Sequence, residues 1–311
     1  MIVSCGEALI DMIPMTGPSG EQSLKPHAGG AVFNTAIALG RLGTRSSFLS
    51  GISTDLFGKV LLKQLHDSNV ETDLVLASDR PTTLAFVELN DGHATYVFYD
   101  ENTAGRMLDP DNLPKVPAAA KAMYFGGISL INEPAADFYL ALAQRESAKR
   151  VIVADPNIRA NFVSDEPRYR ARLEKLIACV DIIKVSDEDL DWIIPGPLTS
   201  LEKADALLER GPKVVVLTRG SEGACALFGE DVLVEVPVQK VTVADTVGAG
   251  DTFNAGFLAD LSENGLLNKE EINNLGEVEM RRALLYGAQV AAITVSRHGA
   301  NPPWKNELAT S

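Results

Sequence analysis

The stretch that decides the fold is DTVGAGDTFNAGF, residues 245–257 of a chain of 311. It follows a β-like run at 240–244 and continues into a predicted helix that ends at Asn264-Gly265. Glycines at a helix N-terminus leave backbone N–H groups open, and with the helix dipole these groups form a site for an anion such as phosphate. Asp251 lies in the first helical turn, where the dipole favours the ionised form that a proton acceptor needs. The alternative is a tight turn in which Asp251 is an ordinary capping acid.

A second glycine pair, in GGAVFN at residues 29–34, opens an amphipathic helix predicted to run to Leu42. Gly29 and Gly30 let a ligand approach the backbone. The Asn34 amide, one turn into the helix, can donate to and accept from a pair of sugar hydroxyls. Two glycines before a helix are also an ordinary turn. The chain carries neither the G-x-G-x-x-G dinucleotide motif nor a Walker A loop.

Short apolar runs alternate with helical patterns over much of the chain. Several of the runs are continuously apolar, as in strands that are covered on both faces. This alternation predicts a doubly wound α/β fold with a mostly parallel sheet. The expected strands are Ile2–Cys5, Ser47–Ser50, Met123–Phe125, Val151–Ala154, Asp181–Val185 and Val214–Thr218, and the expected helices include Ala31–Leu42, Lys59–Asp67, Ala135–Ser147, Arg168–Cys179 and Leu201–Glu209.

Two segments, Leu9–Leu24 and Thr82–Tyr99, are extended without a following helix, so they cannot easily join a parallel sheet. They predict a small separate sheet that acts as a lid, a dimer contact or both. Turn signals at 90–92 and 229–231 predict two hairpins. We therefore expect one α/β domain over residues 1–311, with lid strands inserted at about 9–26 and 82–104.

The composition excludes several classes of function. The net formal charge is −14 and no basic run interrupts it, which disfavours nucleic-acid binding. The N-terminus lacks a signal-peptide pattern and no apolar stretch is long enough to span a bilayer, so we expect a soluble, cytoplasmic protein. The three cysteines lie in apolar runs and are expected to be buried reduced thiols: Cys5, Cys179 and Cys225.

Together, GGAVFNTAIALGRLG at 29–43 and DTVGAGDTFNAGF at 245–257 resemble the two signatures of the PfkB, or ribokinase-like, carbohydrate kinase family. The resemblance extends from GEALID at 6–11 to SRHGANPP at 296–303. It implies a doubly wound α/β fold with a small β-sheet lid. It also implies transfer of a phosphoryl group from ATP to a sugar hydroxyl, a reaction that needs mostly positioning and charge neutralisation.

The resemblance also implies a role for each matching residue. Asp251 is expected to take the proton of the hydroxyl, and the backbone of Gly248, Ala249 and Gly250 to hold the transferred group. The residues expected to bind the sugar are Asp11, Gly29, Gly30, Asn34, Tyr96, Phe98, Asn157 and Arg159, with Arg159 also a candidate for the ATP phosphates. The residues expected at the nucleotide are Lys184, Ser186, Thr218, Gly220, Gly248 and Gly250.

Two metal sites follow from the same resemblance. Ser186 and Asp189 stand where the family usually has N-x-x-E, so the expected magnesium residue is Asp189 or, by a one-residue shift, Glu188. A loop that binds a monovalent cation in relatives matches Asp245, Val247, Thr294 and Gly299, which makes potassium a candidate cofactor, although Pro303 replaces a serine ligand common there.

The sugar is inferred from two stretches. DPNIR at 155–159 resembles fructokinases and 2-keto-3-deoxygluconate kinases. Sugar-acid kinases tend to carry an arginine where this chain has Asp100, which would repel a substrate carboxylate. We therefore expect fructose, phosphorylated to fructose 6-phosphate. The alternatives are a 2-keto-3-deoxygluconate kinase, another PfkB sugar or nucleoside kinase, and a non-catalytic sugar-binding regulator. The apolar lid strands further predict a homodimer through the lid.

Overall fold

The computed structural model describes residues 1–17, 19–90, 93–229 and 232–310. Its main sheet has the strand order β15-β14-β13-β12-β11-β10-β1-β4-β6. The strands from β13 to β6 are parallel, β14 is antiparallel to β13, and β15 is antiparallel to β14. The bounds are β1 (Ile2–Cys5), β4 (Ser46–Leu49), β6 (Val70–Glu71), β10 (Ala122–Gly126), β11 (Val151–Asp155), β12 (Ile182–Ser186), β13 (Val214–Thr218), β14 (Ala224–Phe228) and β15 (Val232–Val236).

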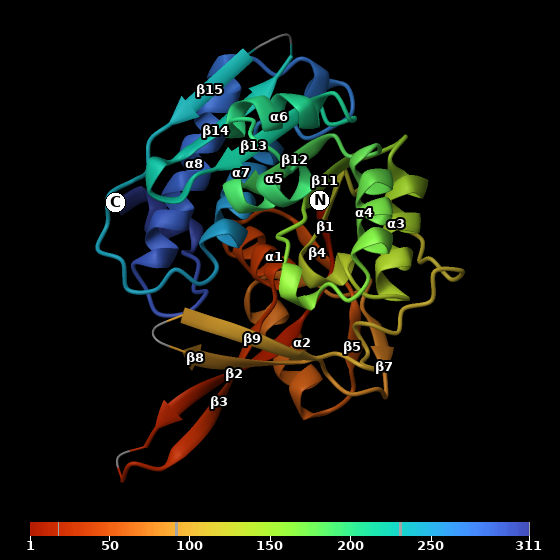
Figure 1. Ribbon diagram of the computed structural model, residues 1–311, viewed down its shortest axis with the longest axis vertical. Coiled ribbons are helices and arrows are strands. Elements are labelled where there is room, and N and C mark those ends of the chain that lie inside the picture. The colour runs from red at the N-terminus through yellow and green to blue at the C-terminus, as the bar shows by residue number, and fades with distance from the viewer. Residues whose placement is uncertain (18, 91–92, 230–231, 311) are drawn as a thin grey trace.

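Helices cover both faces of this sheet (Figure 1). Because side chains alternate along a strand, Tyr124 of β10 joins the core on one face and Phe125 joins the core on the other. The predicted doubly wound α/β fold is thus confirmed. The helices are α1 (Ala31–Arg41), α2 (Leu56–Asp67), α3 (Ala135–Glu146), α4 (Glu166–Ile177), α5 (Asp187–Ile193), α6 (Ser200–Leu208), α7 (Ala249–Glu263) and α8 (Glu277–Val295), with short 3-10 turns η1 (Gly127–Leu130), η2 (Ala160–Phe162), η3 (Gly220–Glu222), η4 (Glu271–Asn273) and η5 (Lys305–Thr310).

A second sheet of order β3-β2-β8-β9 confirms the small separate sheet. It pairs β2 (Leu9–Thr16) with β3 (Gln22–Gly29), and β8 (Leu84–Asn90) with β9 (His93–Tyr99), through two antiparallel hairpins. The β2–β3 hairpin projects away from the body of the molecule (Figure 1). The predicted turn positions 91–92 and 230–231 lie outside the described residues. A short parallel pair of β5 (Gly51–Ser53) and β7 (Leu76–Ser78) was not predicted.

Helix α7 is held in place by α8. A Cβ on Gly256 would lie 2.9 Å from the Cα of Gly287, so the two helices can approach this closely only because both residues are glycine. Helix α8 was not among the predicted helices, although it packs against the element that carries Asp251.

The predicted strand at 240–244 is wrong. These residues are exposed and belong to an irregular segment between β15 and α7, where the described part of the chain offers them no partner strand. β-branched residues alone do not make a strand without a neighbour to pair with. Cys179 is also only half-buried, whereas Cys5 and Cys225 are buried as expected.

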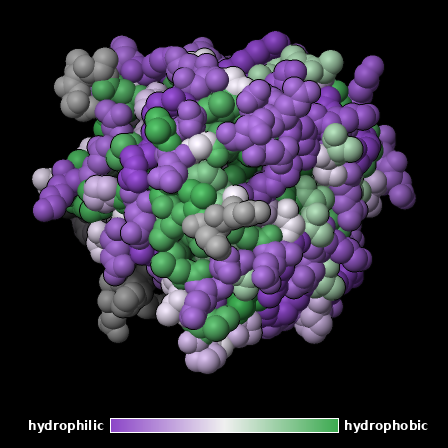
Figure 2. Space-filling model, turned by 90° about the horizontal axis from the view of Figure 1, so that it is seen from above, coloured by the Kyte–Doolittle hydropathy of each residue, from purple (hydrophilic) through white to green (hydrophobic). Residues whose placement is uncertain are grey.

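Figure 2 looks onto the end of the molecule where β14 and β15 meet, and it shows a mostly hydrophilic face with an apolar patch near its centre. Leu233 of β15 is one of the exposed apolar residues of this hairpin. Among the described residues, none of the helices combines the length and apolar character needed to cross a bilayer.

Candidate active site

A cavity of about 320 Å³ lies where the carboxyl ends of the parallel strands, the second sheet and the start of α7 meet. Ligands of open α/β sheets bind at this edge. Most of the predicted catalytic and sugar-binding residues share the cavity. Its lining includes Asp11, Gly30, Asn34, Tyr96, Phe98, Asn157, Arg159, Lys184, Gly248, Ala249, Gly250 and Asp251.

Asp251 lies at the inner wall of this cavity and is only 8% exposed. Its Oδ2 accepts a hydrogen bond of 2.9 Å from the Asn34 amide, and its backbone carbonyl accepts one of 3.0 Å from the Thr35 hydroxyl. Burial raises the pKa of the Asp251 carboxyl to about 7; the bond from Asn34 opposes that rise, and the charge of Asp155 adds to it. A carboxyl that titrates near neutrality suits general-base chemistry.

The backbone before Asp251 forms an anion site. Gly248 caps α7 in the left-handed conformation, with φ of +79°, and a Cβ there would lie 2.7 Å from the Cβ of Ala300. The first N–H groups of an α-helix have no partner inside the helix and can bind a ligand, although the Ala249 N–H also donates to the Thr246 carbonyl at 3.3 Å. The ammonium of Lys184 lies 3.1 Å from where a Cβ of Gly250 would stand, which adds a full positive charge. The turn can therefore bind a phosphoryl group.

The sugar-side residues enclose the other part of the cavity. A Cβ on Gly29 would lie 2.2 Å from Oδ2 of Asp11, so only glycine lets this carboxylate occupy its place. Burial raises the pKa of Asp11 to about 6. The rings of Tyr96 and Phe98 stack with centroids 6.1 Å apart. The cavity thus offers acceptors for hydroxyl groups beside an aromatic wall.

Glu7 is a cavity residue that the sequence patterns did not assign to the site. Its Oε1 accepts from the backbone N–H of Ala31 at 2.9 Å, and its Oε2 accepts from that of Ser129 at 3.3 Å. Gly30, the N-cap of α1, has no side chain to do this, so Glu7 supplies the cap from another segment. Burial raises the pKa of Glu7. The sequence did contain a signal for this role of Glu7. It is an acid directly after a buried strand, and the next predicted helix begins with two glycines, which have no side chain to cap it.

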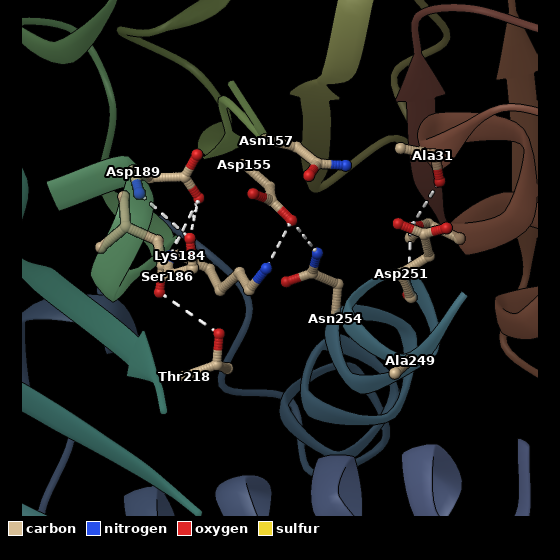
Figure 3. Close-up of polar contacts among 12 residues, drawn as sticks. Ala31, Asp155, Asn157, Lys184, Ser186, Asp189, Thr218, Ala249, Asp251 and Asn254 are labelled. Carbon is tan, nitrogen blue, oxygen red and sulfur yellow. Dashed lines mark hydrogen bonds and ion pairs between the residues drawn. The ribbon is translucent and has the colours of Figure 1, made fainter. Parts of the chain in front are cut away.

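A buried polar network joins α7 to the strand ends (Figure 3). Oδ2 of Asp155, a residue 1% exposed, accepts from Lys184 Nζ at 3.0 Å and from Asn254 Nδ2 at 2.7 Å. The Asn254 amide also donates to the hydroxyl of Tyr124 at 3.0 Å. Asp155 and Asn254 therefore aim the Lys184 ammonium at the anion site. The DPNIR motif is visible in the sequence, but this role of its aspartate is not.

The remaining predicted nucleotide residues lie at the same sheet edge but not among the described residues that line the cavity. Ser186 and Thr218 are paired neighbours on β12 and β13, and Gly220 begins η3 just beyond. The Thr218 hydroxyl donates to the carbonyl of Val185 at 3.4 Å. Ser186 follows Lys184 on β12, so these positions continue the sheet edge beyond Lys184.

The predicted cation loop is assembled by Asp245. Its Oδ1 accepts from the N–H of Val247 at 3.0 Å and its Oδ2 accepts from that of Gly299 at 2.9 Å. Thr294, near the end of α8, is buried and donates its hydroxyl to the Val290 carbonyl. The segments around Asp245 and Gly299, some fifty residues apart in sequence, therefore lie side by side. A cation site built from backbone carbonyls of both segments would require this.

Asp100 does not line the main cavity, contrary to our expectation that it faces the sugar. Its Oδ1 pairs with Arg106 Nη1 at 3.0 Å and its Oδ2 accepts from Asn132 at 3.1 Å. It lines neighbouring pockets at the base of the second sheet and not the main cavity. Because Arg106 balances its charge, Asp100 does not distinguish a sugar acid from a neutral sugar by repulsion.

Comparisons with known proteins agree with this geometry. The model of the pfkB family carbohydrate kinase matches residues 1–307, and the chain belongs to that family. It is 50% identical to a fructokinase of Rhizobium leguminosarum bv. trifolii over 282 residues, which are 90% of this chain and 86% of the relative. Its structure is similar to that of a fructokinase from Xylella fastidiosa with bound ATP, with a TM-score of 0.84, 26% identity and coverage of 99% and 97% of the two chains. A Vibrio cholerae O395 fructokinase in a fructose, ADP and calcium bound form has a TM-score of 0.84 at 25% identity, over 99% and 97%.

The burial of Asp251 predicts a cost in stability that depends on pH. Its pKa is about 7 in the fold against an ordinary value of 3.8. The folded state therefore binds a proton more tightly, and its stability falls as pH rises through that window. Asp251→Asn should raise the free energy of unfolding by more at pH 8 than at pH 5, as measured by urea denaturation. The exposed acid Asp205, changed to Asn, is the control. An equal effect of Asp251→Asn at both pH values would contradict this.

Proposed function

We propose that the protein transfers the γ-phosphoryl group of ATP to fructose and forms fructose 6-phosphate. The observation that supports this most strongly is the position of Asp251. Its buried carboxylate shares the cavity with the hydroxyl-binding groups of Asp11 and Asn34 and with the anion site beside the Lys184 ammonium. The fructokinase names of the relatives, with ATP in one structure and fructose in another, support the choice of both substrates.

The reaction needs a proton acceptor and compensation of charge. The sugar hydroxyl donates its proton to Asp251 as its oxygen attacks the γ-phosphorus, and the bond to the leaving ADP breaks. A general base of this kind contributes about 10² to 10⁴ in rate. The N–H groups of Gly248, Ala249 and Gly250, with the Lys184 ammonium, balance the charge on the transferred group. Arg159 presents a planar fork that suits phosphate oxygens.

The sugar is held by residues of the second sheet and of the start of α1. The Asp11 carboxylate accepts from adjacent hydroxyls, while the open backbone at Gly29 and Gly30 allows close approach. The Asn34 amide nitrogen is engaged by Asp251, so its oxygen is the group that faces a hydroxyl. Tyr96 and Phe98 cover the apolar face of the ring. Residues 1–311 then form one kinase domain in which the second sheet is the lid.

Metal ions complete the proposed site. Magnesium bound to ATP supplies charge neutralisation at the phosphates. No group of three or more acidic, His or Cys side chains in the described part of the chain is arranged to hold a metal, which suits an ion carried in by the nucleotide. Of the two predicted acids, Glu188 is exposed and remains our candidate contact. Potassium would be held by the loop of Asp245, Val247, Thr294 and Gly299.

A substrate panel tests this proposal. ADP release should be fastest with fructose, with kcat/KM about tenfold or more above ribose, 2-keto-3-deoxygluconate and adenosine, a difference of about 1.4 kcal/mol in transition-state binding. Turnover only with the sugar acid or the nucleoside would replace fructose with that substrate. Binding of fructose without turnover of any of the four compounds would favour the non-catalytic regulator.

We also propose that the lid sheet pairs two copies of the chain. The β2–β3 hairpin extends from the body and exposes Ile13, Met15 and Leu24, while β9 exposes Val97 and Tyr99. Exposed apolar groups on a small sheet with open edges favour association. Light scattering at micromolar concentration should give the mass of a dimer, and Met15→Glu should shift it toward the monomer. A monomeric mass for the unchanged protein would contradict a lid-mediated dimer.

A further inference from the structure

Asp189, one of the two acids predicted to bind magnesium, is fully engaged within the protein. It is 5% exposed, and its Oδ1 accepts from the backbone N–H of Ile158 at 2.7 Å. Its Oδ2 accepts from the N–H of Ser186 at 3.0 Å and from the Ser186 hydroxyl at 2.8 Å. A carboxylate that satisfies three donors has little capacity left for a divalent cation, which prefers carboxylates open to it and its waters. The contacts of Asp189 do not fit the role of a magnesium ligand.

The bond from Ile158 to Asp189 affects the site because the residues on either side of Ile158 belong to the cavity. Asn157 and Arg159 both line the cavity. Asn157 has a φ of +43°, in the left-handed region that asparagine adopts more readily than most other residues. Its side-chain oxygen accepts from Arg159 Nη1 at 2.8 Å, so one turn sets the position of both. The Asp189 carboxylate holds the peptide group between them.

The same turn is held on both sides. Before it, Asp155 is bonded to Lys184 and Asn254. After it, the ring of Phe162 packs against Phe98 of the lid with centroids 4.7 Å apart. Between these two contacts, the Asp189 carboxylate accepts a hydrogen bond from the backbone N–H of Ile158. This bond joins α5 to the turn that carries Asn157 and Arg159.

We propose that Asp189 is a positioning residue that holds Asn157 and Arg159 toward the reacting groups, and that it is not a magnesium ligand. This inference rests on the proposed kinase function. The shorter aspartate, in place of the family's glutamate, is the acid that reaches Ser186 and Ile158 at once. A purely structural role, capping α5 through Ser186, would leave the 157–159 turn unaffected.

Hydrogen exchange of the Ile158 amide, followed without nucleotide or metal, tests the contact directly. Asp189→Asn should speed that exchange, because asparagine keeps one acceptor oxygen for the two Ser186 donors and presents its NH2 group, which cannot accept, to the Ile158 N–H. Asp191→Asn, a matched change in the same helix that removes the pair with Lys203, should not. Unchanged exchange in Asp189→Asn would overturn the proposal. Asp189→Glu serves if the first variant fails to fold, and it too should speed the exchange.

Kinetics then separate positioning from metal binding. Asp189→Asn should lower kcat/KM for fructose by about tenfold or more, since small misplacements of binding groups are costly. The magnesium concentration for half-maximal rate should stay within about twofold of that of the unchanged protein. In a protein that already carries Arg159→Ala, adding Asp189→Asn should lower kcat/KM by only about threefold or less, because Asp189 and Arg159 act through the same turn. A large rise in the magnesium requirement, or losses that multiply independently, would overturn the proposal. An inactive unchanged protein would instead refute the proposed function, while the exchange experiment still tests the contact.

Discussion

The Asp251 carboxylate is buried at the N-terminus of α7, and a charge in that position must be balanced by its surroundings. The Asn34 amide donates to it from α1, and the Lys184 ammonium lies close by on β12. Burial nevertheless raises the pKa of Asp251 to about 7, and the charges of Asp155 and Glu7 add to that rise. This balance lets one carboxyl exist in both protonation states near neutral pH. A proton acceptor in phosphoryl transfer needs that property.

Several features of the fold hold the groups around Asp251 in place. Parallel strands bring their carboxyl ends to one edge, which places Asp155 and Lys184 beside each other although they are distant in sequence. The close glycine contact between α7 and α8 fixes how near the two helices lie to each other. Glu7 caps α1 from outside the helix, so Asn34 reaches Asp251 at a fixed distance. Tyr96 and Phe98 of the second sheet line the same cavity.

Much of this could be predicted from local patterns. Continuous apolar runs identified the parallel strands, and the glycine turns identified Asp251 and Asn34. What could not be predicted depends on contacts between distant segments: Glu7 as an external cap, Asp155 as the partner of Lys184, and Asp189 as support for Ile158. The exposed residues 240–244 looked like a strand because β-branched residues fit one, yet no neighbour pairs with them in the described structure. Asp100 looked like a specificity residue because its neutralising partner, Arg106, could not be inferred from spacing.

The most direct test of the account is the turnover number of Asp251→Asn with fructose and ATP at saturation, compared with the unchanged protein. The asparagine keeps the size of the side chain and an acceptor for Asn34 but cannot take a proton. The account predicts that kcat falls by about 10³-fold, within the range for loss of a general base, while both substrates still bind. A kcat within about tenfold of the unchanged protein would contradict the central role of Asp251.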